Sequence, residues 1–290
     1  MISDRGEYTQ LAPLAGHDKE ELEKIEVELL LQAIYRMYGY DFRNYAYDSI
    51  YRRIRYGMQS IGEESISALI PQVLHYPDRM QQLFRYFVVG VTEMFRDPDM
   101  FYSFRKNIIP YLRTYPHIRI WHAGCSTGEE VLSMAILLQE EGLYDRARIY
   151  ATDIDEDALE KAQMGIYPLR NMKVNTYNYI RSGGTRDFSD YYMARKDSVI
   201  FNSSLLKNIV YARHNLVTDQ SFNEFNVVFC RNVLIYFNRE LQNRVHQLLH
   251  DSLAMLGFLV LGDKESMLFN SHSHKYETID KREKLYRKIQ

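Results

Sequence analysis

The most constraining feature of the sequence is the segment from Trp121 to Glu130, which reads Trp-His-Ala-Gly-Cys-Ser-Thr-Gly-Glu-Glu. The residues from Arg119 to Ala123 predict a short buried strand, and residues 124–128 predict a tight turn of small residues. From Glu130 onward, apolar residues at helical spacing predict a helix. Glycines let a backbone approach a ligand closely, and a helix N-terminus supplies free N–H groups. The segment therefore predicts the first strand, turn and helix of a nucleotide-type α/β fold.

A second strand, Arg148 to Thr152, strengthens this prediction because it ends in Asp153-Ile-Asp155. Two glycines alone are a weak signal, since many turns between strands and helices need them. An acidic residue at the end of the second strand is the usual acceptor for ribose hydroxyls in such folds. Asp153 is thus the first candidate ligand-binding residue.

The rest of the C-terminal region continues the α/β pattern with one reversal at its end. Helices are predicted over residues 156–164 and from Asn238 to about Leu256. The further strands are predicted at residues 209–213, 225–230, 257–262, 274–279 and 284–289. The last two strands lack a helix between them, so they should pair antiparallel. A parallel sheet with a reversed final strand matches the arrangement of methyltransferases that use S-adenosylmethionine (SAM).

Residues 175–207 are predicted to be an inserted β-subdomain of this region. Its hairpin spans residues 191–201, with the turn at 194–198. The tract over residues 175–190 is longer than expected and has no assigned role. Insertions of this size are usually functional or mobile.

The N-terminal region is predicted to be a separate, all-helical domain. Residues 1–18 are expected to form an arm, residues 19–88 a small helical domain, residues 89–100 a linker, and residues 101–290 the α/β domain. The first helix is expected to be amphipathic, with an acidic outer face and with apolar residues at helical spacing, namely Leu22, Ile25, Leu29, Leu30, Ala33, Ile34 and Met37.

Composition excludes several classes of function. A formal net charge of −2 supplies no overall attraction to nucleic acid or to anionic lipid. The sequence shows no signal peptide and no apolar run of membrane-spanning length, so we expect a cytoplasmic protein without membrane insertion. The two cysteines, Cys125 and Cys230, have no His or Cys at ligand spacing, which favours packing roles and predicts no metal site.

Four motifs together make the sequence resemble the CheR family of chemotaxis-receptor glutamate methyltransferases. Their order and spacing match the family, and with the helical N-terminal region they cover nearly the whole chain. The motifs are Thr92-Glu-Met-Phe-Arg-Asp97, Cys125-Ser-Thr-Gly-Glu-Glu130, Thr152-Asp-Ile-Asp155 and Phe229-Cys-Arg-Asn-Val-Leu-Ile-Tyr-Phe237.

The resemblance implies transfer of a methyl group from SAM to a glutamate side-chain carboxylate, with S-adenosylhomocysteine (SAH) as product. It implies that Asp153 binds the ribose hydroxyls and that Glu129 holds the cofactor near the first helix of the α/β domain. The other implied cofactor contacts are Thr92, Arg96, Ala123, Asn215, Leu216, Arg231 and Asn232. Arg96 and Tyr236 are the predicted catalytic residues, because a cation and a phenol O–H can both orient the incoming carboxylate. If residues 92–96 are helical, Thr92 and Arg96 lie on one face.

The implied partner is the cytoplasmic helical domain of a chemoreceptor or a similar acidic protein, and the protein is expected to be a monomer. Arg52, Arg53 and Arg55 on the second helix are either a contact surface for that partner or a solvated helix face. The turn at 194–198 lacks the longer glycine-containing loop of members that dock on a receptor's C-terminal pentapeptide, which predicts a pentapeptide-independent member.

Two other departures from the family concern the pocket. Position 90 is Gly where the family usually has Asn, and residues 262–265 read Gly-Asp-Lys-Glu where the family tends to have Gly-His-Ser-Glu. The alternatives left open are a regulatory module that binds SAM or SAH, and a methyltransferase that acts on a non-receptor protein. A nucleic-acid methyltransferase is disfavoured, because the fourth strand lacks the Asn/Asp-Pro-Pro-aromatic turn of enzymes that act on flipped bases.

Overall fold

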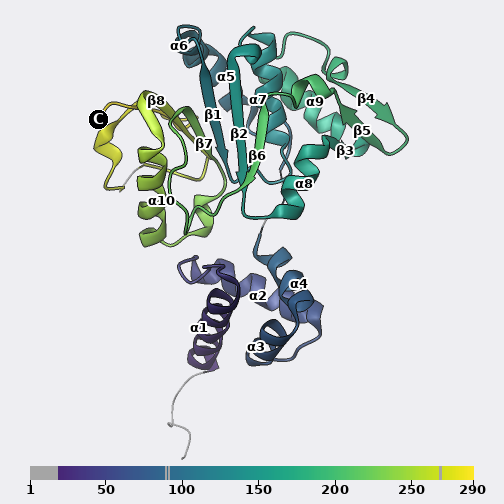
Figure 1. Ribbon diagram of the computed structural model, residues 1–290, viewed down its shortest axis with the longest axis vertical. Helices are drawn as coiled ribbons and strands as arrows, with labels where there is room; N and C mark the ends of the chain where they lie inside the picture. The colour runs from purple at the N-terminus through teal and green to yellow at the C-terminus, as the bar shows by residue number, and fades with distance from the viewer. Residues whose placement is uncertain (1–18, 89, 91, 268–269) are drawn as a thin grey trace, which may run out of the picture. The chain divides into compact units, whose positions relative to one another are not determined.

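The computed structural model describes residues 19–88, 90, 92–267 and 270–290. The predicted arm over residues 1–18 lies outside the described residues. The chain divides into two compact units. The smaller unit comprises residues 19–43 and 48–87, and the larger unit comprises residues 44–47 and the described residues from Val88 onward. Each unit is described by itself (Figure 1).

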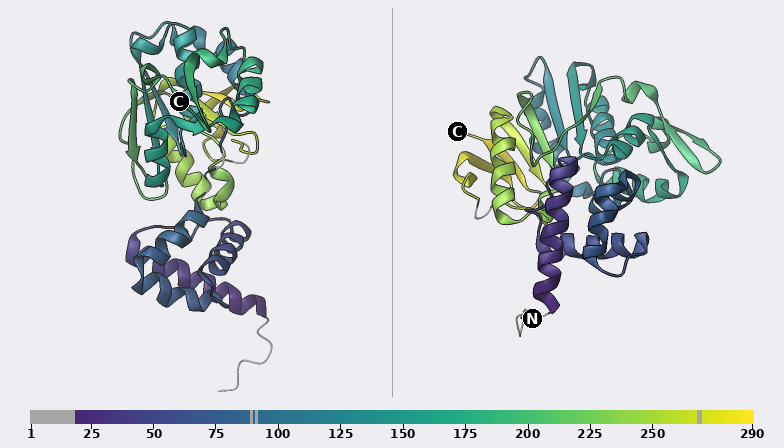
Figure 2. Two further views of the ribbon diagram at one scale, coloured as in Figure 1. Left: turned by 90° about the vertical axis from the view of Figure 1, so that its right-hand side faces the viewer. Right: turned by 60° about the horizontal axis from the view of Figure 1, so that its bottom comes forward.

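The smaller unit is all helical and has its own apolar core. Its helices are α1 (Lys19–Tyr38), α2 (Tyr47–Ile61), α3 (Ile66–His75) and α4 (Pro77–Phe87). Helix α3 packs against both α1 and α4. Figure 2 shows the helices of the smaller unit in two further views. Helix α1 buries Val27, Leu30, Leu31 and Ile34.

The predicted apolar face of α1 is wrong in part. Leu22, Ile25, Leu29 and Met37 are exposed, with between 43% and 57% of their surface accessible. The helix carries apolar residues on two sides, and the side that packs is centred on Leu30 and Ile34, which are fully buried. The sequence pattern merged the two sides into one stripe.

The larger unit is built on a seven-stranded sheet in the order β6-β2-β1-β7-β8-β10-β9. Its strands are β1 (Ile118–Ala123), β2 (Ala147–Asp153), β6 (Ile209–Arg213), β7 (Phe225–Cys230), β8 (Leu253–Leu261), β9 (Tyr276–Asp280) and β10 (Leu285–Lys288). Strands β6, β2, β1, β7 and β8 are parallel, whereas β10 pairs antiparallel with both β8 and β9. The predicted sheet with a reversed last strand is confirmed.

Two separate apolar layers cover the faces of this sheet. The helices are α5 (Pro98–Asn107), α6 (Ile109–Leu112), α7 (Glu129–Glu140), α8 (Glu156–Met164), α9 (Met172–Arg181) and α10 (Arg239–Asp251). Alternate strand residues separate the layers, because Ile120 packs with residues of α5 and α7 while Trp121 packs with residues of α10. Figure 1 shows α10 in front of the sheet and α7 behind it.

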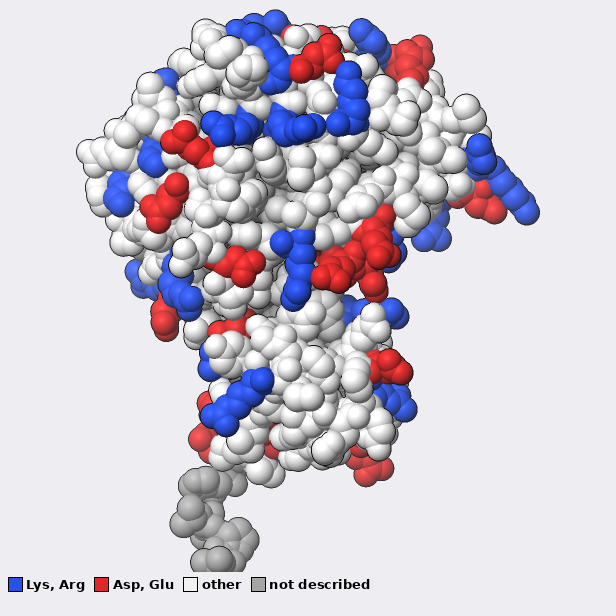
Figure 3. Space-filling view, viewed as in Figure 1, with Lys and Arg blue, Asp and Glu red and all other residues white. Residues whose placement is uncertain are grey.

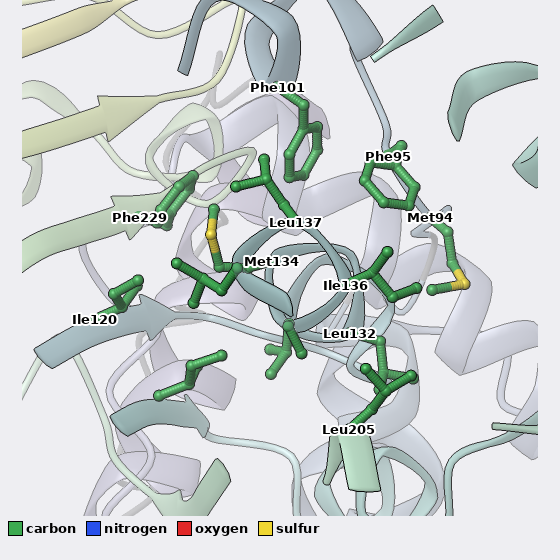
Figure 4. Packing of buried hydrophobic residues seen from close by; sticks show 14 of the residues in the cluster. Met94, Phe95, Phe101, Ile120, Leu132, Met134, Ile136, Leu137, Leu205 and Phe229 are labelled. Atoms are coloured by element: carbon green, nitrogen blue, oxygen red, sulfur yellow. The ribbon is translucent and has the colours of Figure 1, made fainter. Parts of the chain in front are cut away.

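Helix α7 lies at the centre of the first layer. Every residue from Val131 to Leu138 is buried, so this helix is enclosed on all sides. Figure 4 shows Phe95, Phe101 and Phe229 around Met134 and Leu137. The enclosure holds the N-terminus of α7 in a fixed place at the ends of the strands.

The last long helix is shorter than predicted. Helix α10 ends at Asp251, and β8 begins at Leu253, whereas the sequence predicted a helix to about Leu256. The Oγ of Ser252 donates to the carbonyl of Leu248, and the Ser252 carbonyl accepts the N–H of Phe225. Leu253 then pairs with Phe225 in the sheet. The prediction ran past the true end of α10 because β8 is also apolar, so leucines at helical spacing continue into the strand.

A small antiparallel sheet in the order β3-β5-β4 combines two strands of the predicted insertion with β3, which lies before residue 175. Strands β4 (Tyr192–Arg195) and β5 (Ser198–Phe201) confirm the predicted hairpin, and β3 (Ile166–Pro168) completes the sheet. Figure 1 shows this sheet beyond α9, on the β6 side of the large sheet.

A buried carboxylate, Glu140 at the end of α7, anchors the long tract between α9 and β4. It accepts hydrogen bonds from the hydroxyls of Tyr179 and Tyr191 and from the N–H of Thr185, and it pairs with Arg105. The tract at 175–190 is therefore an ordered part of the larger unit. None of the helices in the described ranges is long and apolar enough to span a membrane.

Candidate active site

Four parallel strands of the large sheet end side by side, and each end carries a residue that was predicted to line the pocket. The neighbouring strands are β6, β2, β1 and β7. Ala123 and Asp153 are the last residues of β1 and β2, while Asn215 and Arg231 follow β6 and β7. Ligands of open α/β sheets bind beyond the carboxyl ends of the strands, so this edge is the candidate active site.

The turn after β1 is tight because its glycines adopt backbone conformations that side chains disfavour. Gly124 has φ of 81° and Gly128 has φ of 87°. A Cβ on Gly124 would lie 2.5 Å from Cγ2 of Val233, and one on Gly128 would lie 2.7 Å from Cβ of Ala162. The N–H groups of Gly124 and Cys125 donate to the carbonyl of Thr152, which ties the turn to the end of β2. The turn thus closes one side of the site with main chain.

Asp153 lies where an acceptor for a ribose is expected. Its Oδ2 accepts the N–H of Ser126 at 2.7 Å, and its Oδ1 accepts the N–H of Asp155 at 3.0 Å. These bonds fix the carboxylate, and each oxygen keeps a lone pair for a ligand hydroxyl. Burial raises the pKa of Asp153, although the two N–H donors oppose the rise.

Glu129 is the first residue of α7 and is 8% exposed. Its Oε2 accepts the hydroxyl of Thr127 at 2.7 Å, and the hydroxyl of Tyr167 donates to the carbonyl of Thr127. Burial raises the pKa of Glu129. Within the described part of the chain, no Lys, Arg or His forms an ion pair with it. Glu129 is therefore a fixed carboxylate with capacity for a cationic ligand group.

Three carboxylates surround the turn, and they make the local potential negative. Burial raises the pKa of the Cys125 thiol well above its ordinary value, and the charges of Asp153, Glu130 and Glu129 raise it further. Only Glu130 of these three has a cationic partner among the residues that the structure describes. Such a site favours a ligand with positive charge and hydroxyl groups over an anionic one.

Arg231 binds two carboxylates and acts as a clamp. Its Nη1 lies 2.7 Å from Oε2 of Glu130, and its Nη2 lies 2.6 Å from Oδ2 of Asp97. Nδ1 of His122 lies 2.8 Å from the other oxygen of Glu130. Burial by itself would raise the pKa of Glu130, but Arg231 and His122 outweigh burial and lower it to about 2. Because both guanidinium ends are occupied, a cofactor contact of Arg231 is left to its main chain.

The segment that carries Thr92 and Arg96 is fixed by hydrogen bonds and is not helical. The N–H of Phe95 donates to Oγ of Ser133 at 2.8 Å, and the amide of Asn178 donates to the carbonyl of Met94. The next helix, α5, begins only at Pro98. The condition under which Thr92 and Arg96 would share one helical face is therefore not met, and both residues are half-buried.

A Cβ on Gly90 would meet only Oγ of Ser126, at 3.8 Å. The position at which this chain departs from the family therefore has room for a larger side chain.

The remaining predicted residues lie on the loops after β6 and β7. Asn215 is 8% exposed, and its Oδ1 accepts the N–H of Val217, while Leu216 packs against the core that contains Trp121. Asn232 has a left-handed φ of 60°. Tyr236 ends a short 3-10 helix, η5 (Leu234–Tyr236), and is half-buried.

The arginines of α2 belong to the smaller unit and do not share one environment. Arg53 is buried, and its guanidinium donates to the carbonyl of Phe87. The prediction that Arg53 contacts a partner is therefore wrong, because its donors serve the helical core. Arg52 is exposed and Arg55 is half-buried, so these two are accessible from outside the core.

Sequence reasoning missed the residues that hold the predicted ones in place. Ser133 on α7 and Asn175 and Asn178 on α9 hold Met94 and Phe95, Glu130 binds Arg231, and Glu265 binds the loop after β7. The only feature of the sequence that could have indicated these residues is the presence of polar residues at helix positions where apolar ones are expected.

The comparisons with known proteins agree with this geometry. The model described as "CheR methyltransferase, SAM binding domain" matches residues 90–285, and "CheR methyltransferase, all-alpha domain" matches residues 25–88. The chain belongs to the CheR methyltransferase family. It is accordingly a SAM-dependent methyltransferase with the two domains of that family.

The CheR relatives include proteins that align over nearly the whole chain. "Putative methyltransferase Cher3" of Pseudomonas putida is 50% identical over 91% of this chain and 97% of its own length. "Chemotaxis protein methyltransferase 2" of Pseudomonas aeruginosa is 26% identical over 90% of this chain and 93% of its own. "Chemotaxis protein methyltransferase" of Escherichia coli is 25% identical over 87% of this chain and 84% of its own.

Proposed function

We propose that this protein transfers the methyl group of SAM to the side-chain carboxylate of a glutamate in a chemoreceptor or a related signalling protein. The observation that carries the proposal is the pair of carboxylates without an ion-pair partner in the described chain, the buried Glu129 and the half-buried Asp153, at the glycine turn of a CheR-family domain. The names of the chemotaxis relatives support the choice of a chemotaxis protein as substrate.

The residues at the strand ends fit SAM and SAH. In the proposed complex, Asp153 accepts hydrogen bonds from the ribose hydroxyls and Glu129 faces the ligand's ammonium group. The turn from Gly124 to Gly128 allows close approach by main chain. Thr92, Ala123, Asn215, Leu216, Asn232 and the main chain of Arg231 line the remaining walls.

The reaction requires few groups of the protein beyond those that position the two substrates. The sulfonium of SAM supplies an activated methyl group, so the S–CH3 bond breaks as the new O–CH3 bond forms. A glutamate carboxylate is ionised at neutral pH and needs no general base. The protein therefore acts mainly by holding the carboxylate in line with the methyl group. Arg96 and Tyr236 orient that carboxylate in the proposal, because each can donate hydrogen bonds to it.

The charge distribution does not favour nucleic acid as the substrate. On the face drawn in Figure 3, the larger unit carries both basic and acidic side chains, with several Lys and Arg side chains in a row on its upper part and a group of Asp and Glu side chains lower down. The net charge of the whole chain is −2. A protein partner with an acidic surface, which would contact a few arginines of this chain locally, fits these observations better than nucleic acid does.

Peptide mapping of the host's chemoreceptors by mass spectrometry tests the proposal. Receptors incubated with this protein and SAM should acquire glutamyl methyl esters at defined residues, and receptors incubated with SAM alone should not. Methyl esters found only on a soluble protein would support the proposed reaction but would mean that the substrate is that soluble protein and not a chemoreceptor. SAH binding without any transfer would instead favour a regulatory module.

A further inference from the structure

We propose that Glu265 is a positioning residue whose buried carboxylate holds the loop after β7 in the shape that presents Asn232 and Tyr236 to the active site. The inference rests on the proposed function for the roles of Asn232 and Tyr236. The geometry of the loop stands apart from those roles.

Four main-chain N–H groups converge on this one carboxylate. Oε1 accepts the N–H of Val233 at 2.8 Å and that of Leu234 at 2.7 Å. Oε2 accepts the N–H of Asn232 at 3.1 Å and that of Gly262 at 2.6 Å. Glu265 is 4% exposed, so water does not compete for these donors. A carboxylate has enough lone pairs for all four bonds, and a neutral side chain of this size does not.

The loop depends on this acceptor at the points where its backbone is least regular. Asn232 has a left-handed φ, and the N–H groups of Val233 and Leu234 precede and begin the 3-10 turn that ends at Tyr236. Such N–H groups have no partner within their own turn and need an outside acceptor. Glu265 therefore acts as a cap for η5 that is supplied from a distant part of the chain.

The neighbouring glycine shows how closely this contact is fitted. A Cβ on Gly262 would lie 2.8 Å from Oε2 of Glu265 and 2.9 Å from the nitrogen of Asn232. The next two residues, Asp263 and Lys264, are exposed, which indicates no comparable close packing at their positions. Glu265 forms no ion pair within the described ranges, so the N–H donors alone compensate its charge.

The test compares Glu265→Gln with the matched control Glu277→Gln, which changes an exposed glutamate on β9. The glutamine keeps the size of the side chain but turns an NH2 group toward N–H donors. Amide hydrogen exchange of the peptide over residues 231–237 should become faster in Glu265→Gln, and SAH affinity should fall about tenfold. The kcat for receptor methylation should fall further than SAH affinity does, because Tyr236 is displaced as well. Glu277→Gln should match the wild type in all three measurements.

Wild-type exchange and SAH affinity in a folded Glu265→Gln would overturn the proposal. If Glu265→Gln does not fold, Gly262→Ala decides, because its methyl group presses on the same contact. Faster exchange of residues 231–237 in Gly262→Ala would support the proposal, and unchanged exchange would overturn it. A wild-type protein that methylates no receptor would contradict the proposed function but leave the exchange and SAH measurements decisive for Glu265.

Discussion

The candidate pocket depends on two carboxylates, the half-buried Asp153 and the buried Glu129, that have no ion-pair partner in the described chain. Burying a charge is unfavourable unless hydrogen bonds or a ligand compensate it. Asp153 receives two N–H bonds and Glu129 receives one hydroxyl bond. The oxygen lone pairs that remain on both carboxylates would accept hydrogen bonds from a ligand with an ammonium group and ribose hydroxyls.

Replacing Asp153 with alanine should weaken SAH binding by about ten- to a hundredfold, because two hydrogen bonds to a charged acceptor are lost. Isothermal titration calorimetry measures this directly. Glu160→Ala, which removes an exposed carboxylate from α8, is the matched control and should bind as the wild type does. Equal affinity of Asp153→Ala and the wild type would refute the ribose assignment.

SAH binding should also depend on pH in one direction. Burial raises the pKa of Asp153 and of Glu129, so both take up protons at higher pH than exposed carboxyls, whose pKa is about 4. A ligand with an ammonium group favours the ionised forms. Affinity should therefore be constant near neutral pH and fall as the pH is lowered through the raised pKa values. Titrations across this range should show the decline in the wild type and a smaller one in Glu129→Gln. A flat profile for the wild type would contradict the assignment.

At the scale of elements, the sequence predicted several strands and helices whose apolar residues face the core. It did not predict α5, whose buried side is largely apolar, or α9, whose buried side is partly polar. Strands β1 and β2 and helix α7 were predicted because their buried residues are apolar. Helix α9 was missed because its buried side includes Asn175 and Asn178, while Tyr177 and Ile180 are exposed. A pattern that assumes apolar residues point inward cannot identify such a helix.

Candidate site residues at the strand ends could be predicted, since parallel strands bring their carboxyl ends to one edge. The ion pairs that hold them could not be predicted, because Arg231 lies more than a hundred positions from both Glu130 and Asp97. The resemblance to the family implied a ligand contact for Arg231. Only the fold shows that its partners are carboxylates of the protein.

The clamp between α7, the loop after β7 and the segment before α5 should stabilise the larger unit. Glu130→Gln removes one of the two carboxylate partners of the buried Arg231 and should lower the free energy of unfolding by about 3 kcal/mol. Urea unfolding followed by circular dichroism measures the loss. Asp145→Asn, which removes the exposed partner of Lys207, should leave the midpoint unchanged.

The contribution of Glu130 should follow pH as well. Its pKa is about 2 in the folded protein and about 4.3 when unfolded, so its stabilisation is complete above the unfolded value. The stabilisation should be lost between about pH 4.3 and pH 2. Wild-type stability in Glu130→Gln at neutral pH would show that the clamp contributes nothing.

At the scale of the whole molecule, cofactor binding and partner binding are assigned to different units. The proposed SAM contacts lie on the larger unit, and the accessible arginines Arg52 and Arg55 lie on α2 of the smaller one. We propose that these two arginines contact acidic side chains of the receptor.

Reversing both charges with Arg52→Glu and Arg55→Glu should raise the KM for receptor at least several-fold through repulsion, while SAH affinity stays at the wild-type value. Initial rates of methylation at varied receptor concentration measure this. Arg79→Glu on α4 is the control for charge change on the same unit and should have the wild-type KM. A double variant with unchanged KM would show that α2 is only a solvated face.

The most direct test of the account is methyl transfer from labelled SAM into receptor-containing membranes of the host, followed by mild alkali. Glutamyl methyl esters hydrolyse to volatile methanol, whereas methylated amines and nucleic acids do not. The account predicts alkali-labile label on a chemoreceptor with the wild-type protein and its loss with Arg96→Glu, which repels the substrate carboxylate. Label that resists alkali, or no label from a protein that binds SAH, would contradict it.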